Sequence, residues 1–331
     1  MLRARDITMF LHNRYGVAFF MLLAVAAVIY ALTAGIVTPL QGDNGLVVTS
    51  PNNWLQPGAA SSVLSIVMNV AVALSAISLN KQYNTMRSLS MLVASVFMVM
   101  QLASPAVLGL FNGSGVLAVG LSLITMLLFS VFSDVSSTRR MFLIFFLLAS
   151  FSLFEYSFLL YVPVLLVGFS QMRVMNFRSF LAAIIGFITP LWILLGFGII
   201  TIEDIRFPHF KSFLDAIKTP GMWYQLVIIG VTIILGITFM VMNAIKMMSY
   251  NSRIRAANGF LTILMLATIL FIFADYNNIY VYISLLNILV AYQIGHYFAT
   301  HIQSNRSYIG ILSIMLIYLA FFAARFYENS Y

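Results

Sequence analysis

The 331-residue chain contains no cysteine and very few charged side chains. The lack of cysteine excludes disulfide bonds, thiolate metal ligands and a cysteine nucleophile. Charged residues make up only 8% of the sequence, against roughly 25% in a typical soluble domain, whereas 62% of the residues are hydrophobic. A water-facing surface cannot be built from this composition, so we expect one integral membrane domain over residues 1–331.

Motifs for several common chemistries are also missing. The sequence has no Walker loop, no Gly-x-Ser-x-Gly nucleophile motif and no His-Glu-x-x-His zinc motif. His296 and His301 are five residues apart with no acid nearby in the sequence, so we expect no metal site and no cofactor. No ladder of acids or arginines runs through the apolar segments, which argues against an ion-coupled transporter.

The chain is instead rich in apolar segments that can cross a bilayer, which takes about 20 residues in a helix. The run from Met141 to Gln171 fits two short spans or a hairpin broken near Glu155, whereas a single long helix would invert every later segment. The sequence therefore predicts an all-α polytopic transmembrane bundle. We place its eleven spans near residues 16–37, 59–79, 88–108, 115–132, 140–154, 156–172, 179–200, 222–242, 259–274, 277–298 and 308–325.

The gaps between these spans differ in charge in a regular alternation. Counted from the N-terminus, one alternate set of gaps holds 13 of the 17 basic residues, and the other set holds 7 of the 9 acidic residues. The 13 basic residues are Arg3, Arg5, Arg14, Lys81, Arg87, Arg139, Arg140, Arg173, Arg178, Lys246, Arg253, Arg255 and Arg306. The 7 acidic residues are Asp43, Glu155, Glu203, Asp204, Asp215, Asp275 and Glu328.

Lys and Arg accumulate in short cytoplasmic loops of membrane proteins. The alternation therefore predicts a cytoplasmic N-terminus and an outer C-terminus. The net charge of +8 follows from these loops, where basic residues face anionic lipid headgroups. We accordingly expect membrane lipids, and no nucleic acid, as partners.

Two of the expected outer loops are long, at residues 38–58 and 201–221. The first is rich in Gly, Pro and Asn, which is typical of ordered turns. In the second, Phe210, Leu214 and Ile217 repeat at helical spacing between Pro208 and a Pro-Gly stop. We expect this stretch to form a short helix lying in the membrane interface.

Three acids near the expected outer face are candidates for chemistry. Asp43 lies in a loop without a basic residue to pair with it, and a carboxylate there can act as a general base. The alternative is an ordinary turn, because Gly42-Asp43-Asn44-Gly45 has typical turn composition. Glu155 lies between two short spans, where an acid at membrane depth is often functional. Asp275 has a similar position but a more turn-like context.

Arg206, His209 and Lys211 form a small basic group in the second outer loop, where cations are the exception. They are candidate substrate-binding residues, because Arg and Lys can hold the phosphate of a lipid-linked substrate. The alternative is local pairing with the acids Glu203 and Asp204 of the same loop.

Four amides lie within the expected spans: Asn69, Gln101, Asn287 and Gln293. Hydrogen bonding between helices is the usual role of such residues in a membrane. If they all faced one cavity, they would instead line a polar path for a transported lipid or solute.

The middle and the tail of the chain resemble a family of uncharacterised multi-pass inner-membrane proteins of Gram-negative bacteria. The resemblance covers about half of the chain, carries no assigned activity and implies a location in a bacterial inner membrane. It rests on Arg139-Arg140-Met141-Phe142, Leu147 to Phe151, Tyr161-Val162-Pro163, Asn176 to Phe180, Ile185 to Pro190 and Ile283 to Tyr292.

The order of spans and loops also resembles the GT-C class of glycosyltransferases, which use polyprenyl-phosphate sugars at the outer face. This resemblance implies that Asp43 deprotonates an acceptor hydroxyl and that Arg206 or Lys211 stabilises the leaving phosphate. Two alternatives remain open: a lipid or solute transport protein, and a non-catalytic membrane subunit of an envelope-assembly complex.

Overall fold

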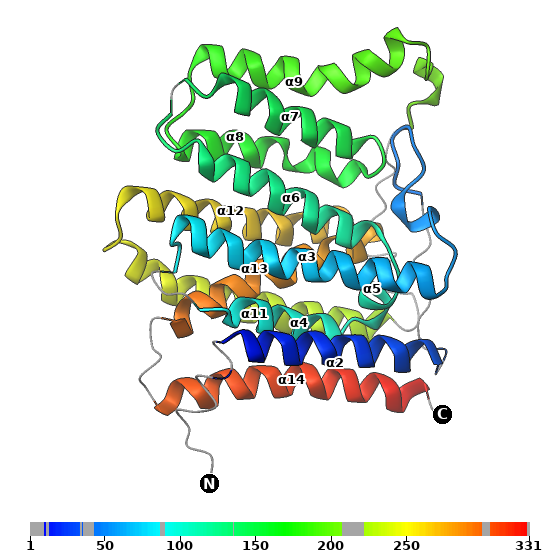
Figure 1. Ribbon diagram of the computed structural model, residues 1–331, viewed down its shortest axis with the longest axis vertical. Coiled ribbons are helices and arrows are strands. Elements are labelled where there is room, and N and C mark those ends of the chain that lie inside the picture. Colours follow the sequence, from blue (N-terminus) through cyan, green and yellow to red (C-terminus); the bar gives the residue numbers. More distant parts are fainter. Residues whose placement is uncertain are drawn as a thin grey trace.

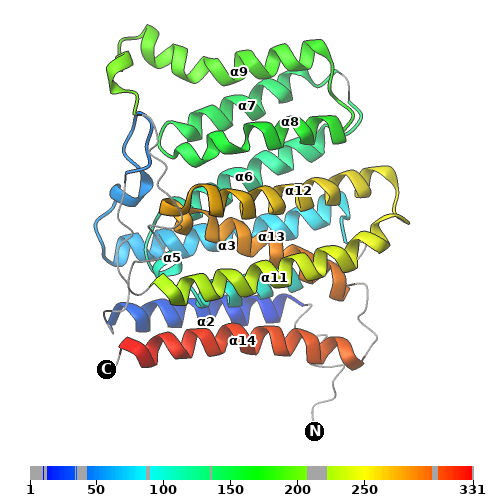
Figure 2. The ribbon, with the colours of Figure 1, turned by 180° about the vertical axis from the view of Figure 1, so that it is seen from behind.

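The computed structural model describes residues 10, 13–33, 35, 43–86, 90–134, 136–206, 222–299 and 305–329, and every regular element within them is a helix. The long helices lie side by side and run alternately in opposite directions (Figure 1; Figure 2). The α-helices are α2 (Arg14–Thr33), α3 (Ala59–Tyr83), α4 (Leu92–Leu102), α5 (Pro105–Gly109), α6 (Gly113–Ser130), α7 (Thr138–Ser152), α8 (Val162–Gln171), α9 (Phe177–Gly196), α11 (Met222–Met247), α12 (Ser252–Ala274), α13 (Ile279–Ala299) and α14 (Asn305–Asn329). Four short 3₁₀ helices join them: η1 (Pro51–Asn53), η2 (Tyr156–Tyr161), η3 (Ile202–Asp204) and η4 (Tyr276–Asn278).

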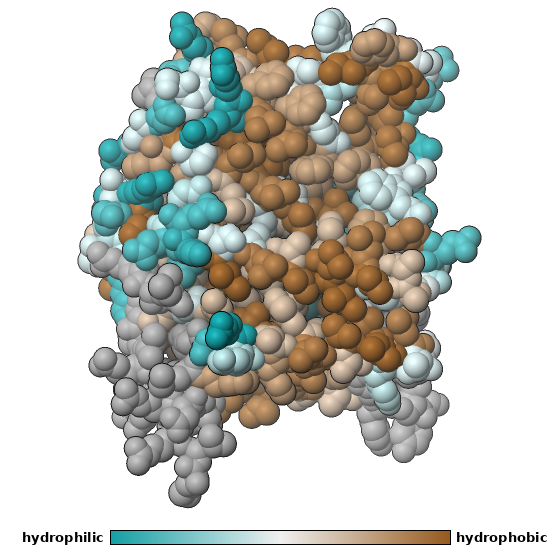
Figure 3. Space-filling view, in the orientation of Figure 1, coloured by the Kyte–Doolittle hydropathy of each residue, from teal (hydrophilic) through white to brown (hydrophobic). Residues whose placement is uncertain are grey.

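Seven of the described helices are long and apolar enough to cross a membrane, namely α2, α3, α6, α9, α11, α12 and α13. Shorter apolar helices cover 92–102, 156–171 and 309–324. Figure 3 shows hydrophobic side chains across the middle of one face and hydrophilic ones along its two edges, where the helices end. The predicted all-α, multi-pass membrane fold is confirmed for the described residues.

One expected span is broken. The sequence predicts one span near 88–108 with a kink at Pro105, but α4 ends at Leu102 and α5 begins at Pro105. Proline has no N–H group and disfavours helical geometry in the residue before it, and Ser104 is accordingly non-helical. Carbonyl groups of α5 find partners elsewhere: the Ser65 hydroxyl donates to Leu108 O at 2.8 Å. This satisfies backbone groups that lipid could not.

The run from Met141 to Gln171 folds back on itself instead of forming one long helix. Helix α7 ends at Ser152, and η2 and α8 return in the opposite direction (Figure 1). The single long helix is therefore excluded, whereas two short spans and a hairpin broken near Glu155 both fit this path.

Asparagine side chains begin three of the long helices. The Asn112 side chain accepts hydrogen bonds from the first N–H groups of α6, and Asn176 and Asn251 do the same for α9 and α12. Such caps satisfy N–H groups that have no partner inside the helix. They set where these helices start without placing a charge at the membrane edge.

Helix α13 lies at the centre of the bundle and packs against α3, α4, α6, α11 and α12. Almost all of its residues are buried. Its amide Asn287 donates to Gln101 Oε1 at 3.2 Å, and Gln101 in turn donates to Asn69 Oδ1 at 2.9 Å. Gln293 belongs to a separate group, because it accepts a hydrogen bond from Asn243 at 3.0 Å. Hydrogen bonding between helices thus occupies all four predicted amides.

The two ends of the bundle carry different charges. Helices α3, α8, α11 and α13 end, and α7, α9, α12 and α14 begin, at the same end of the molecule, on the left in Figure 1. We call it the basic end, and its described basic residues are Arg14, Lys81, Arg139, Arg140, Arg173, Arg178, Lys246, Arg253 and Arg255. We call the opposite end the acidic end, and its described acids are Asp43, Glu155, Glu203, Asp204 and Asp275.

Helix α9 lies at the edge of the bundle and packs closely on α7 through small residues. A Cβ atom added at Gly186 would lie 2.4 Å from the backbone oxygen of Phe142, which is too close for any side chain. In contrast, a Cβ atom at Gly196 of the same helix would meet nothing within 4 Å. Gly186 therefore sets how closely the two helices approach.

We expect Gly186→Ala to lower the thermal unfolding midpoint of the detergent-solubilised protein. Alanine favours the helix by about 1 kcal/mol at either glycine, but at position 186 the overpacking costs about 1–3 kcal/mol. Gly196→Ala is the matched control and should leave the midpoint unchanged or slightly raised. Equal midpoints for the two variants would contradict the close α7–α9 contact.

Candidate functional site

At the acidic end, the segment 43–50 is bound to the turn between α7 and η2. The N–H groups of Val47 and Val48 donate to the carbonyl of Leu153 at 2.9 and 3.0 Å. The N–H group of Tyr156 donates to the carbonyl of Asn44 at 2.9 Å. These backbone bonds bring the first long loop against residues more than a hundred positions later in the chain.

Asp43 is fully engaged in this segment. Its Oδ1 atom accepts the N–H groups of Ser50 at 2.8 Å and Gly45 at 3.3 Å. Its Oδ2 atom forms an ion pair with the guanidinium group of Arg206, whose own N–H donates to Leu46 O at 2.7 Å. The expectation that Asp43 has no basic partner is therefore wrong. Its partner lies 163 residues later in the chain, so the local sequence could not reveal it.

The surroundings of Asp43 favour its charged form. Partial burial acts to raise its pKa, but the N–H groups of Ser50 and Gly45, together with Arg206, hold the pKa below its ordinary value. A carboxylate with a lowered pKa is a weak proton acceptor at neutral pH. Asp43 is therefore suited to position Arg206 and the 43–50 segment.

Glu155, in the turn outside the helical segments, has the opposite environment. Its side chain is completely buried and accepts the hydroxyls of Ser157 at 2.8 Å and Ser50 at 3.4 Å. Gly113 gives it room, since a Cβ atom there would lie 2.6 Å from Glu155 Oε2. Burial, with the nearby charge of Asp275 as a smaller contribution, raises the pKa of Glu155 to about 8.

Asp275 is the second buried acid, between α12 and η4. Its Oδ2 atom accepts the hydroxyls of Tyr156 at 2.6 Å and Tyr282 at 2.7 Å, and its Oδ1 atom accepts the amide of Asn278 at 2.9 Å. It is 1% exposed. The turn-like sequence around Asp275 gave no indication of these tyrosine partners, one of which, Tyr156, lies 119 residues earlier in the chain.

Ser50 connects these groups. Its N–H group donates to Asp43 and its hydroxyl donates to Glu155, so a single residue links the ion pair to the buried acid. We call Asp43, Ser50, Glu155, Arg206 and Asp275 the acidic-end cluster. Within the described part of the chain, neither Glu155 nor Asp275 forms a salt bridge. The described residues also contain no group of three metal-ligating side chains.

This arrangement can support proton transfer. Asp275 is close enough for its charge to contribute to the raised pKa of Glu155. Around them, serine and tyrosine hydroxyls donate to the carboxyl oxygens. A carboxyl group with a pKa near 8 exchanges its proton readily at physiological pH, as a general acid or base must. Arg206 adds a partly exposed guanidinium group, which can bind an anion.

The remaining predicted site residues lie outside the described part of the chain. They are His209 and Lys211, together with the predicted interfacial helix that contains Phe210, Leu214 and Ile217. Of the predicted basic group, the structure thus places Arg206 alone. Its partner is Asp43, and Asp204 instead accepts the backbone N–H and the hydroxyl of Thr201.

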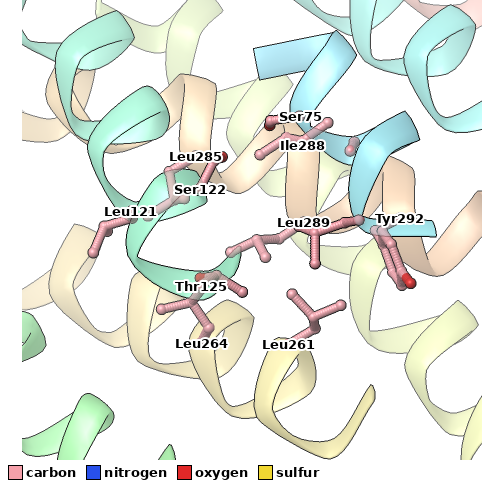
Figure 4. Close-up of a pocket in the computed structure, with 12 residues that line it drawn as sticks. Ser75, Leu121, Ser122, Thr125, Leu261, Leu264, Leu285, Ile288, Leu289 and Tyr292 are labelled. Atoms are coloured by element: carbon pink, nitrogen blue, oxygen red, sulfur yellow. The ribbon is translucent and has the colours of Figure 1, made fainter. Parts of the chain in front are cut away.

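A small cavity lies deeper in the bundle, between α3, α6, α12 and α13. Its volume is about 30 Å³, and leucine and isoleucine side chains form most of its wall, with the hydroxyls of Ser122 and Thr125 nearby (Figure 4). A space of this size holds one or two water molecules. It is far too small for a sugar or a lipid chain, so it adds nothing to the acidic-end cluster.

Comparison with protein-family models, with curated proteins and with solved structures finds no match to this chain.

We expect the stability of the wild-type protein to fall as the pH rises from about 5 to about 8. The unfolded chain loses the Glu155 proton near the ordinary value of 4.5, whereas the folded protein keeps it up to about 8. Between these values the folded state binds more protons, so its free energy of unfolding decreases with pH. Thermal unfolding midpoints in detergent across this range measure the effect.

The matched variant is Glu155→Gln, which imitates the protonated acid and cannot ionise. Its midpoint should vary less with pH than that of the wild type, and the two curves should diverge toward pH 8. Parallel curves would show that Glu155 ionises normally in the folded protein.

Proposed function

We propose that the protein transfers a sugar from a polyprenyl-phosphate donor at the acidic end of the bundle, as the GT-C resemblance implies. One observation carries the proposal. Asp43, Glu155 and Arg206, which come from three segments far apart in the chain, meet through Ser50. A proton acceptor and an anion-binding group are thereby held at one end of a membrane bundle, which is what this reaction requires.

In the proposed reaction, the oxygen of an acceptor hydroxyl attacks the anomeric carbon of the donor sugar. The bond between that carbon and the phosphate oxygen breaks, and polyprenyl phosphate leaves with the electron pair. Ionised Glu155 accepts the hydroxyl proton, since its raised pKa makes it a better base than Asp43. Arg206 stabilises the charge that develops on the leaving phosphate. Asp43 holds Arg206 in place before the donor arrives.

We further propose that the chain crosses a bacterial inner membrane eleven times, with the basic end in the cytoplasm. In addition to the seven long apolar helices, α4 with α5, α7, η2 with α8, and α14 also run between the two ends of the bundle (Figure 1). The basic residues gather at one end, as cytoplasmic loops do. The acidic-end cluster would then face the periplasm, where lipid-linked sugars are used.

The natural absence of cysteine allows a direct test of this orientation. Single cysteines would be introduced as Glu203→Cys at the acidic end and Met248→Cys at the basic end, both at exposed positions. A membrane-impermeant maleimide should label Glu203→Cys in intact cells and Met248→Cys only after the inner membrane is permeabilised. Labelling of Met248→Cys in intact cells would reverse the proposed orientation.

The transferase itself is tested by profiling envelope glycans and lipid-linked sugars in a deletion strain complemented with variants. We expect Glu155→Gln to reproduce the deletion phenotype, because loss of a general base typically lowers the rate about 10²–10⁴-fold. Arg206→Gln should cause a defect of about 10²–10³-fold in transfer rate through lost phosphate stabilisation. Glu203→Gln, the same chemical change at an exposed acid of the same end, should behave as wild type.

Membrane abundance of each variant is the control for folding. If the deletion changes glycans while Glu155→Gln and Arg206→Gln restore them fully, the acidic-end cluster is not the catalytic site. An unchanged glycan profile in the deletion strain would remove the transferase proposal altogether.

A second candidate, transport coupled to proton movement, is favoured by one observation. Glu155 and Asp275 are both buried without a salt bridge in the described residues, and acids of this kind carry protons in transporters. Reconstituted vesicles with a pH-sensitive dye in their lumen distinguish the two candidates. Proton uptake that Glu155→Gln abolishes would favour transport, and its absence would favour the transferase.

A further inference from the structure

A pair of arginine side chains converges on Tyr83 at the basic end. The guanidinium group of Arg253, at the start of α12, lies over the Tyr83 ring at 5.5 Å from its centre. Arg140, at the start of α7, is close enough to act electrostatically on the Tyr83 hydroxyl. Both arginines are exposed, so their positive charges are available at the surface.

Helix α6 holds the parts of this group in position. The Tyr83 hydroxyl donates to the carbonyl of Met126 at 3.0 Å, and Arg140 Nη1 donates to the carbonyl of Ser130 at 2.9 Å. These two carbonyls are four residues apart in one helix, or about 6 Å along its axis. The Tyr83 hydroxyl and the Arg140 guanidinium group are therefore held about one helical turn apart.

The Tyr83 ring is itself fixed by the aromatic core. It contacts the ring of Phe129 edge to face at 5.6 Å, and Phe129 contacts Phe260 in the same way at 6.0 Å. A rigid ring beneath Arg253 restricts that side chain, so less freedom is lost when the arginine binds a partner. Such preorganisation is absent from an arginine that extends freely into water.

Opposite charge near these arginines is scarce in the described residues. Arg140 itself forms an ion pair with Asp134 at 4.0 Å, in which both side chains are about half exposed. An exposed pair at that distance contributes little to binding. The arginine pair thus keeps most of its positive charge for another partner.

We propose that Arg140, Arg253 and Tyr83 form a binding site for the phosphate of an anionic phospholipid headgroup. The site lies where apolar helices end, at the depth at which lipid phosphates meet a membrane protein. Arginine suits this partner because its planar guanidinium group binds phosphate oxygens in pairs. The Tyr83 ring provides an apolar contact for the glycerol region. The inference concerns the end opposite the acidic-end cluster and does not depend on the proposed function.

The test titrates the detergent-solubilised full chain with phosphatidylglycerol and counts bound lipid by native mass spectrometry. We expect Arg140→Gln/Arg253→Gln to weaken binding about 30-fold, because two charge-assisted contacts between guanidinium groups and the phosphate are lost. The matched control is Arg178→Gln/Arg255→Gln, which removes two exposed arginines from the same end. It should bind within about threefold of wild type, because it removes the same charge without removing a contact to the bound phosphate. Equal losses in both double variants would overturn the site in favour of diffuse attraction.

Two further arms complete the design. Arg140→Lys/Arg253→Lys keeps both charges but loses the paired hydrogen bonds of each guanidinium group to the phosphate. It should therefore weaken binding less than the glutamine variant does. It also provides a measurement if the glutamine variant fails to fold. Binding equal to wild type in the lysine variant would overturn the role of the guanidinium groups. Inorganic phosphate should not displace the lipid at millimolar concentration, and full displacement would identify the ligand as a free anion.

Discussion

The structure depends on the requirement that polar groups inside an apolar bundle find their partners within the protein. Lipid offers no hydrogen bonds, so an unpartnered polar group at membrane depth costs several kcal/mol. In helix α13, which is almost entirely buried, Ser284, Asn287 and Gln293 meet this requirement by bonding to neighbouring helices at several depths. Ser284 and Ser114 share a hydrogen bond at 2.9 Å, and Asn287 bonds to Gln101. These bonds fix the register of the central helix against at least two others.

The same requirement explains the acidic-end cluster. Glu155 and Asp275 are buried, yet the described residues provide serine and tyrosine hydroxyls as partners instead of cations. A hydroxyl donates to a carboxylate and can also accept from a carboxylic acid, so it satisfies both protonation states. An arginine in the same place would hold the acid permanently ionised. The choice of hydroxyls over cations leaves Glu155 free to gain and lose a proton.

Local sequence patterns were sufficient to locate the helices but not the contacts between them. Apolar runs predicted each long helix because hydrophobic content within about 20 residues decides whether a helix can lie in a membrane. At Pro105 a kink was expected, but the helix is completely interrupted. Ser65, on another helix, stabilises this interruption by a hydrogen bond. Nothing near Pro105 in the sequence indicates that Ser65 lies within hydrogen-bonding distance.

At the candidate site, too, the local sequence identifies the residues but not the contacts between them. Asp43, Glu155 and Arg206 stood out as charged residues in loops, which is a local property. Their connection depends on Ser50, an unremarkable loop serine, and on the docking of the 43–50 segment against Leu153. Contacts that span more than a hundred residues arise from the packing of α7, α6 and α13, so no short window of sequence contains them.

The two ends of the bundle handle charge differently, and side-chain length accounts for the difference. Arginine and lysine have long apolar stems, which lie along the helices while the charged group stays in water. The basic residues at that end are accordingly mostly exposed. Glutamate and aspartate are too short to extend in this way from a buried turn, so Glu155 and Asp275 remain among the hydroxyls around them. The acidic end thus holds buried carboxyl groups among hydroxyls, whereas the basic end presents its charges at the surface.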